Sequence, residues 1–456
     1  MIAGPLLALL FVSIAVWLLM RKYNAVAILL FGGVIMQLVA YFLLGKLPKL
    51  KQPTNLAYFD FVQYITEALA DTNAGVGLVI MIISGFVAYM DKIGASDALV
   101  SAAMKPLHAL KKYPYVLASL VLPLGQFLFV SIPSAAGLGL LLMASVFPIL
   151  VSLGVSRLSA VSLITATTAF GIGPASAIAL SAASVIEMDI TGYFFQYQIP
   201  KVIPLSIVLT ISYYFVNRYF DKKNNLVMQE EIGIHQTKDK KESAPAIYAI
   251  LPILPLVLLL VFSDFVNLFE PAIKLDTNAA MIIGLFTALI FEFIRVKDAK
   301  KVLHSLDIFW NGMADIFKSV VVLIIAADIF SKGLIALGFI DGLVSISQGL
   351  GFGAVGIGIV MTVMIFMASI LMGSGNAAFF AFGPLVPKIA TQLGADAVTI
   401  ILPMSLAASM GRTVSPIAGV LVATASIAKV TPLDVVKRNA IPFGIGFVLM
   451  LLFNYL

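Results

Sequence analysis

The 456-residue sequence contains no cysteine, only three histidines and only 11% charged residues. Without cysteine, disulfide bonds and thiolate metal ligands are excluded. The histidines, His108, His235 and His304, lie in loop-like contexts, where solvated side chains are more common than metal ligands. The sequence also contains no P-loop, no HExxH zinc motif and no GxSxG nucleophile elbow. We therefore expect a protein that is not an enzyme and that needs no cofactor.

Apolar residues, by contrast, make up 61% of the chain, far above the proportion in soluble globular domains. A stretch of about 20 apolar residues is long enough to cross a bilayer core of about 30 Å. Six stretches meet this criterion: residues 3–20, 25–45, 197–217, 246–263, 278–294 and 438–455. The first lacks a basic n-region and a cleavage site, so we expect it to be retained. The composition predicts an all-α polytopic membrane protein, surrounded by the lipid bilayer.

The net charge of +6 at pH 7 is spread over short loops between the predicted spans. This distribution is typical of membrane topology, so we expect no nucleic-acid partner. The longest polar run, residues 218–245, carries six basic residues and is predicted to be a cytoplasmic linker loop. Counting spans outward from this loop places both chain termini outside. Lys46, Lys49 and Lys51 would then be external, although lysine and arginine are generally enriched in cytoplasmic loops.

Two halves of the sequence, residues 1–217 and 246–456, contain related segments. "KIGASDALVS" (92–101) matches "ALGFIDGLVS" (336–345), and further matches follow in the same order over about 80 residues. Because each half is predicted to contain five spans, an odd number, the halves would cross the membrane in opposite directions. Such an inverted-topology repeat, with about ten transmembrane helices in all, is typical of transporters.

Each half also contains a short polar tip between two apolar segments, "VSIPSAAG" (130–137) or "MGSGNAAF" (372–379). A connection this short predicts a helical hairpin. The tips carry no lysine or arginine that would anchor them in water, which favours re-entrant hairpins. Fully spanning hairpins would have the same sidedness and remain open.

A glycine-proline interruption follows each hairpin, "AFGIGPAS" (169–176) within 157–183 and "MGRTVSPIAG" (410–419) within 397–425. These patterns predict two broken helices. Because such breaks free backbone groups that lipid cannot satisfy, we expect both to line a cavity inside the protein.

Arg412 lies inside the second break, near the middle of an apolar stretch. An arginine at the bilayer centre costs at least about 2.5–3.5 kcal/mol, so it is expected to face a polar interior. The tips and breaks would also direct several helix N-termini, each with about half a positive charge, at one cavity. Both features favour an anion, and the planar guanidinium suits a carboxylate. An ion pair between Arg412 and Asp328 or Asp315 is the alternative that the sequence leaves open.

Further candidate binding residues are the hydroxyl, amide and glycine positions of the tips and breaks: Ser131, Ser134, Thr167, Gly171, Gly173, Ser374, Asn376, Thr413 and Ser415. The tips and breaks contain no aspartate, glutamate or histidine. A coupling cation would therefore be held by backbone carbonyls and hydroxyls, which suits sodium. The backbone positions would be those of Ser134, Gly171, Gly375 and Gly411. Sodium and proton coupling both remain open.

"SGNAAFFAFGPLVPKIA" (374–390) followed by "GRTVSPIAGVLVATASIAKVTPLDVVKRNAIP" (411–442) resembles the C-terminal signature of the DcuC-type anaerobic four-carbon dicarboxylate carriers, within the ion transporter superfamily. The likeness covers nearly the whole chain in length, span order and hairpin position. It implies uptake, efflux or exchange of succinate, fumarate, malate or aspartate across a bacterial inner membrane. It also implies a homodimer that works by an elevator motion.

The resemblance further implies a division into two units. The transport unit would comprise residues 72–183 and 313–425, connected through interfacial helices at 93–112 and 334–350. The scaffold would comprise residues 1–71, 184–217, 246–312 and 426–456. In related sodium-dicarboxylate carriers each tip reads Ser-Asn-Thr, whereas Ser-Gly-Asn and Pro-Ser-Ala stand at the tips here. This departure puts sodium coupling in doubt.

Three other interpretations remain open. A monocarboxylate or citrate would fit, because one arginine binds one carboxylate. A sodium/proton antiporter of the same superfamily would use Asp91, Asp315 or Asp328 as its ion carrier. A membrane binding or scaffold protein without transport would leave the paired tips and breaks without a role.

Overall fold

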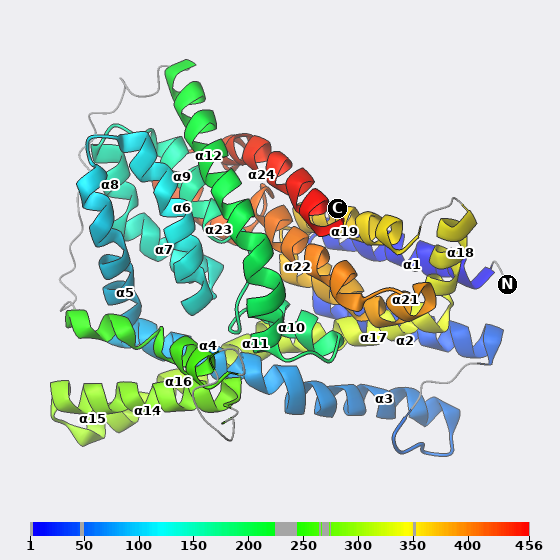
Figure 1. Cartoon of the computed structure of the whole chain (residues 1–456). Helices are drawn as coiled ribbons and strands as arrows, with labels where there is room; N and C mark the ends of the chain where they lie inside the picture. Colours follow the sequence, from blue (N-terminus) through cyan, green and yellow to red (C-terminus); the bar gives the residue numbers. More distant parts are fainter. Residues whose placement is uncertain are drawn as a thin grey trace.

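The computed structural model describes residues 3–45, 50–223, 244–263, 275–349 and 353–455, together with Val266 and Ile273. Within this part the secondary structure is helical, without strands (Figure 1). Nine continuous helical stretches of the described chain are long and apolar enough to cross a membrane. The chain is therefore an all-helical multi-pass membrane protein, as the sequence predicts. Most of the predicted linker loop lies outside the described residues, as do Lys46, Lys49 and His235.

The α-helices of the first half, in chain order, are α1 Ala3–Met20, α2 Ala25–Leu44, α3 Ala57–Thr72, α4 Leu78–Ile93, α5 Ala95–Met104, α6 Pro114–Ser131, α7 Ala135–Ser145, α8 Phe147–Ser152, α9 Arg157–Ala166, α10 Ala177–Val185, α11 Ile190–Gly192 and α12 Ile199–Lys223. Those of the second half are α13 Leu254–Val261, α14 Thr277–Val296, α15 Ala299–His304, α16 Leu306–Ile316, α17 Val322–Ala336, α18 Phe339–Gly349, α19 Ala354–Met372, α20 Gly375–Phe382, α21 Val386–Leu393, α22 Ala397–Thr413, α23 Gly419–Ala428 and α24 Pro432–Tyr455.

Five of the six predicted spans are helical, and they correspond to α1, α2, α12, α14 and α24. The sixth stretch, 246–263, is not one continuous α-helix, and whether it crosses the membrane stays a prediction. This stretch forms a 3₁₀ segment, η4 Ala246–Ile250, then a turn and the eight-residue α13. Pro252 and Pro255 explain the difference, because proline lacks the N–H that a continuous helix needs.

The order of elements is similar in the two halves. In each, a helix runs through a short π-helical segment into a second helix, α3–η1–α4 in the first half and α16–η5–α17 in the second. η1 is Asn73–Gly77 and η5 is Phe317–Val321. A short helix (α5 or α18), a hairpin and a broken helix follow in both halves. π-helical turns are rare and frequent at functional sites. Opposite membrane orientation of the halves stays a prediction.

The two halves pack against each other through contacts between helices of one half and helices of the other. α4 of the first half lies against α14 and α16, and α17 of the second half lies against α2 (Figure 1). Glycines permit the close approach. A β-carbon on Gly33 would lie 2.6 Å from the Ile329 carbonyl carbon, and one on Gly85 would lie 2.7 Å from the Phe309 oxygen. Small residues of this kind let membrane helices gain van der Waals contact between backbones.

Both predicted tips and both predicted breaks occur. In the first half the tip lies between α6 and α7, and the break separates α9 from α10. In the second half the tip lies between α19 and α20, and the break separates α22 from α23. Serine caps each returning helix. The Ser134 hydroxyl accepts a hydrogen bond from the Gly137 amide (3.1 Å), and the Ser374 hydroxyl accepts one from the Ala377 amide (3.3 Å). Re-entrant placement of the hairpins stays a prediction.

A buried ion pair joins the end of α12 to the start of α24. Arg438 Nη2 lies 3.1 Å from Asp221 Oδ1, and the two side chains are only 3% and 0% exposed. Asp221 also accepts hydrogen bonds from Ser156 (2.9 Å) and Ser159 (2.8 Å), at the start of α9. These contacts tie two helices assigned by the resemblance to the scaffold to a helix assigned to the transport unit.

Asn439 extends this polar contact. Its Nδ2 donates to the carbonyl of Thr413, at the end of α22 (3.1 Å), and to the Thr165 hydroxyl in α9 (3.2 Å). Its Oδ1 accepts a hydrogen bond from the Tyr213 hydroxyl of α12 (2.8 Å). Asn439 therefore links both broken helices to α12 and α24.

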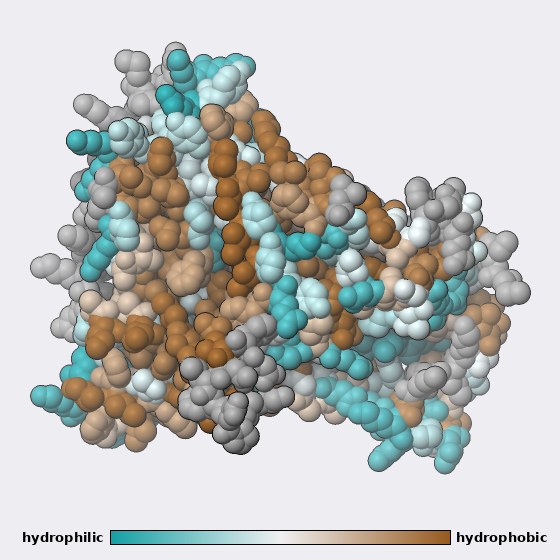
Figure 2. Space-filling view, in the orientation of Figure 1, coloured by the Kyte–Doolittle hydropathy of each residue, from teal (hydrophilic) through white to brown (hydrophobic). Residues whose placement is uncertain are grey.

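The outer surface is apolar along the helices. Ile203, Ile207, Ile211 and Phe215 of α12 are each more than half exposed and follow one another at intervals of four residues. They form an apolar stripe along α12 in Figure 2. An exposed stripe of this kind suits a helix that faces lipid.

Candidate functional site

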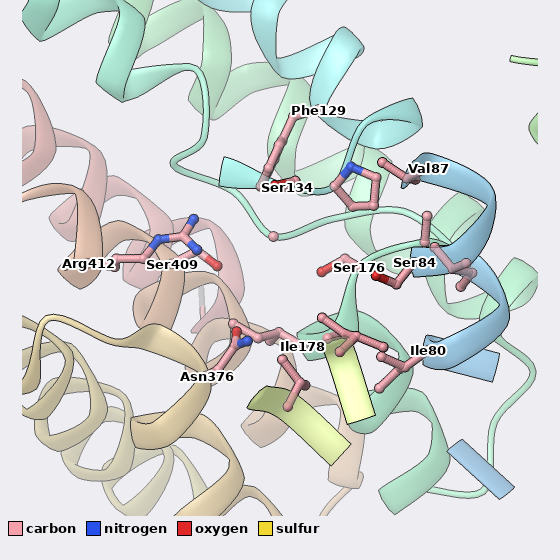
Figure 3. A pocket seen from close by; sticks show the side chains of 17 residues that line it. Ile80, Ser84, Val87, Phe129, Ser134, Ser176, Ile178, Asn376, Ser409 and Arg412 are labelled. Carbon is pink, nitrogen blue, oxygen red and sulfur yellow. The ribbon is translucent and has the colours of Figure 1, made fainter. Parts of the chain in front are cut away.

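A cavity of about 180 Å³ lies where the first tip, the first break, the C-terminal end of α22, α20 and α4 come together. Six of its lining residues have polar side chains: Ser84, Ser134, Ser176, Asn376, Ser409 and Arg412. Figure 3 shows Arg412 and Asn376 on one side of the cavity and Ser84 of α4 on the other. Apolar residues of α4 and the π segment η5, including Ile80, Val87 and Val320, complete the wall. The side of the cavity formed by α4 is therefore apolar apart from Ser84, and the other polar side chains come from the first tip, the first break, α20 and α22.

Arg412 reaches the cavity from the last turn of α22. Its Nη2 donates a hydrogen bond to the Thr168 carbonyl (2.8 Å), just beyond the end of α9. Its buried Nε has no partner among the described residues. The arginine thus lies at the C-terminal ends of two helices, whose partial negative charge stabilises a cation. Carbonyl dipoles hold the guanidinium in place without neutralising it.

No carboxylate of the described chain forms an ion pair with Arg412. The alternative of a pair with Asp315 or Asp328 therefore has no support in the structure. Neither residue lines the cavity, nor does Asp91, whose carboxylate accepts a hydrogen bond from Ser96. Arg412 is left with donor capacity directed at the cavity.

Helix N-termini face the same space from other directions. Ser134 caps α7, Ser176 caps α10, and Asn376 occupies the first turn of α20. All three line the cavity. The first amides of a helix have no intrahelical partner and carry partial positive charge. Together with Arg412 they give the cavity a positive potential that suits an anion.

Four of the predicted site residues line the cavity, namely Ser134, Gly171, Asn376 and Arg412. Three other predicted hydroxyls donate to backbone carbonyls. The Thr167 hydroxyl donates to the Ile164 carbonyl (2.7 Å), the Thr413 hydroxyl to the Ser409 carbonyl (3.0 Å), and the Ser415 hydroxyl to the Ile370 carbonyl (2.6 Å). The first two are local bonds of the kind that is common for threonine in and beside helices, and the third joins the second break to α19.

The remaining candidates lie around the tips and breaks. Ser374 caps α20, and the Gly173 amide donates to Gln198 Oε1 (3.0 Å). Ser131 lines a separate cavity of about 10 Å³, and its buried hydroxyl has no partner in the described part of the chain. Of the four backbone positions predicted for a cation, Ser134 and Gly171 line the main cavity. Gly375 and Gly411 instead permit close packing, because a β-carbon on either would lie 2.5 Å from a carbonyl oxygen.

Three polar lining residues were not predicted, Ser84, Ser176 and Ser409. Ser176 ends the quoted motif of the first break, and Ser409 lies three residues before Arg412, so both positions carry a signal in the sequence. Residues three apart share one face of a helix. Ser84 carries no such signal, because it lies inside α4 and outside the tips and breaks.

Comparison with known proteins gives a consistent result. Residues 4–455 match the family model described as "DcuC: C4-dicarboxylate anaerobic carrier". The anaerobic C4-dicarboxylate transporter DcuC of Escherichia coli K12 is 34% identical over 437 residues, which cover 95% of this chain and 92% of that protein. The similarity therefore extends over almost the whole of both chains.

Two solved transporter structures share the fold. The YdaH transporter of Alcanivorax borkumensis superposes with a TM-score of 0.62 at 13% identity, covering 94% of this chain and 98% of that chain. MtrF of Neisseria gonorrhoeae, described as one of a class of antimetabolite efflux pumps, has a TM-score of 0.59 at 14% identity, covering 94% of each chain. At these identities the likeness concerns the fold alone.

Proposed function

Because the chain belongs to the DcuC family of C4-dicarboxylate anaerobic carriers, we propose that it is a secondary transporter that moves succinate, fumarate, malate or aspartate across a bacterial inner membrane. The observation that carries this proposal is Arg412, a half-buried arginine with a buried Nε, which faces the cavity without an acidic partner in the described chain. A bound carboxylate would supply the missing negative charge through charge-assisted hydrogen bonds.

Substrate binding and movement are coupled through this charge. An empty cavity contains a cation that carbonyl dipoles only partly compensate, and moving it through an apolar environment is unfavourable. A bound dicarboxylate neutralises the site and lowers this cost. The loaded carrier should therefore cross between its two states more readily than the empty one, which favours exchange over leak.

The motion that we propose is an elevator movement in a homodimer. The tips and broken helices (72–183 and 313–425) would move, and the scaffold units 1–71, 184–217, 246–312 and 426–456 would stay fixed. The opposite orientation of the two halves and the re-entrant hairpins belong to the same proposal. α9 and α22 of the moving unit form buried contacts with α12 and α24 of the scaffold. Sliding between the two units at this surface would break these contacts, so they test where the boundary between the units lies. Cross-linking α9 to α12 through introduced cysteines tests it, since a fixed scaffold at α12 predicts that the cross-link blocks transport.

Counterflow in proteoliposomes tests the function. Vesicles loaded with unlabelled succinate should accumulate labelled succinate, with competition by fumarate and malate but not by lactate or citrate. Parallel sodium and potassium buffers would reveal a coupling cation. Absence of uptake in both buffers would refute the proposal and favour a sodium/proton antiporter or another anion carrier.

Arg412→Ala provides the matching test of the site. A hydrogen bond to a charged group contributes about 1.5–3 kcal/mol, so the half-saturating succinate concentration should rise at least about tenfold. Thr424→Val is the control, because the Thr424 hydroxyl is fully buried and binds only carbonyls of its own helix, α23. Unchanged counterflow in Arg412→Ala would show that the substrate binds elsewhere.

A further inference from the structure

The hydroxyl of Ser409 is buried, lines the cavity and has no hydrogen-bond partner among the described residues. Serine in the middle of a helix usually donates to a carbonyl one turn earlier. Thr413, one turn further along α22, does so, with the Ser409 carbonyl as its acceptor (3.0 Å). A buried hydroxyl without a partner is unfavourable, so an unpaired hydroxyl that lines a cavity is a candidate contact for a ligand.

Gly171 shows what lies opposite this hydroxyl. A β-carbon on Gly171 would lie 2.6 Å from Ser409 Oγ and 3.3 Å from Ser176 Oγ. Hydroxyls from the two broken helices therefore converge on one small space, and glycine keeps that space open. Its φ is not in the left-handed region, so the backbone does not require glycine here. A side chain at this position would fill part of the cavity, which accounts for glycine here.

The N-terminus of α10 borders the same space. Ser176 is the cap of this nine-residue helix, and its hydroxyl accepts from the Ala179 amide at 3.4 Å. The amides of Ala177 and Ile178 precede the first helical hydrogen bond, and both residues line the cavity. These amides and the Ser409 hydroxyl are donors and carry no negative charge. Their arrangement suits an anion better than a cation.

We propose that Ser409, Ser176 and the first amides of α10 form a second carboxylate subsite, which takes the carboxylate distal to Arg412. Ser409 and Arg412 lie on one face of α22, three residues apart, so the two subsites are neighbours in one cavity. A short dicarboxylate spans them. A monocarboxylate fills only one, and citrate carries a third carboxylate that has no counterpart in the lining.

The subsite rests on the proposed function, and it makes a separate prediction about selectivity. Ser409→Ala should weaken binding of succinate at least about tenfold, because a donor to a charged group is lost. The same change should leave binding of butyrate within about twofold, because butyrate has the same four carbons but no second carboxylate. Gly171→Ala adds a methyl group against both hydroxyls and should have the same selective effect.

The test measures displacement of labelled succinate from the purified full-length protein by unlabelled succinate and by butyrate. Wild type, Ser409→Ala, Gly171→Ala and the control Thr424→Val are compared, with thermal unfolding to establish that each variant is folded. A selective loss of succinate affinity in both variants supports the subsite. Equal losses for succinate and butyrate, or no loss in Ser409→Ala, overturn it.

Two further outcomes separate this inference from the proposed function. If wild type fails to bind succinate, the dicarboxylate function itself is wrong. If Ser409→Ala changes only the difference between sodium and potassium buffers, the space holds a cation and the carboxylate subsite is wrong. Should Ser409→Ala fail to fold, Gly171→Ala decides the question, because it removes no polar group.

Discussion

The Asp221–Arg438 pair allows a direct measurement of what burial does to an ion pair in this protein. Two aspartates each lie 3.1 Å from a basic nitrogen: Asp221 from Arg438 Nη2, and Asp434 from Lys437 Nζ. In the first pair the side chain of Arg438 is 3% exposed and that of Asp221 is 0% exposed. In the second pair the side chain of Lys437 is 77% exposed and that of Asp434 is 44% exposed. The nitrogen–oxygen distance is thus the same in the two pairs, whereas the exposed fraction of the side chains differs.

Asp221→Ala removes several hydrogen bonds in addition to one charge. Asp221 accepts hydrogen bonds from Ser156, Ser159 and Tyr115 in addition to Arg438. The substitution leaves the buried arginine uncompensated, which typically costs about 3–5 kcal/mol. Asp434→Ala breaks an exposed pair, which is worth about 0–1 kcal/mol. We therefore expect the free energy of unfolding to fall several times more in Asp221→Ala than in Asp434→Ala.

Reversible unfolding in mixed micelles measures both changes. The double variant Asp221→Ala/Arg438→Met should recover much of the loss, because replacing a whole buried pair by apolar groups is often close to neutral. Equal losses in the two aspartate variants would refute the argument from burial. A double variant no more stable than Asp221→Ala would show that the hydrogen bonds to the serines, and not the unpaired charge, dominate.

Three other changes test the packing. Gly33→Val should lower the free energy of unfolding by at least about 1–3 kcal/mol, because a β-carbon there meets the backbone of Ile329; an unaltered unfolding curve would count against the close contact of α2 with α17. Gly444→Ala in α24 should stabilise the fold by up to about 1 kcal/mol in the same assay, because nothing lies within 4 Å of an added β-carbon and alanine favours a helix; destabilisation would contradict this. Asn439→Leu should cost about 1–3 kcal/mol by leaving the Thr413 carbonyl and the Tyr213 hydroxyl unpaired, and full stability would show that water replaces the amide.

Local chemistry determines which parts of the fold the sequence predicts. The breaks depend on glycine and proline, and the tips on serine caps, so both are visible in short segments. The wall made by α4 is not visible, because it depends on how α4 packs in the folded protein and on no short motif. Thr413 and Ser415 show a different limit. Their residue types suit a binding site, but their hydroxyls donate to the carbonyls of Ser409 and Ile370. These acceptors can be identified only from the folded backbone.

The polar lining of the cavity has a consequence for the pH dependence of transport. The described side chains that supply it are serine hydroxyls, one amide and one guanidinium, and none of these titrates between pH 5 and pH 8. The cavity lining therefore keeps one charge state over this range. Any proton that crosses with the substrate through this cavity must travel on the substrate's own carboxylate, and the apparent affinity should follow the ionisation of the acid that is transported.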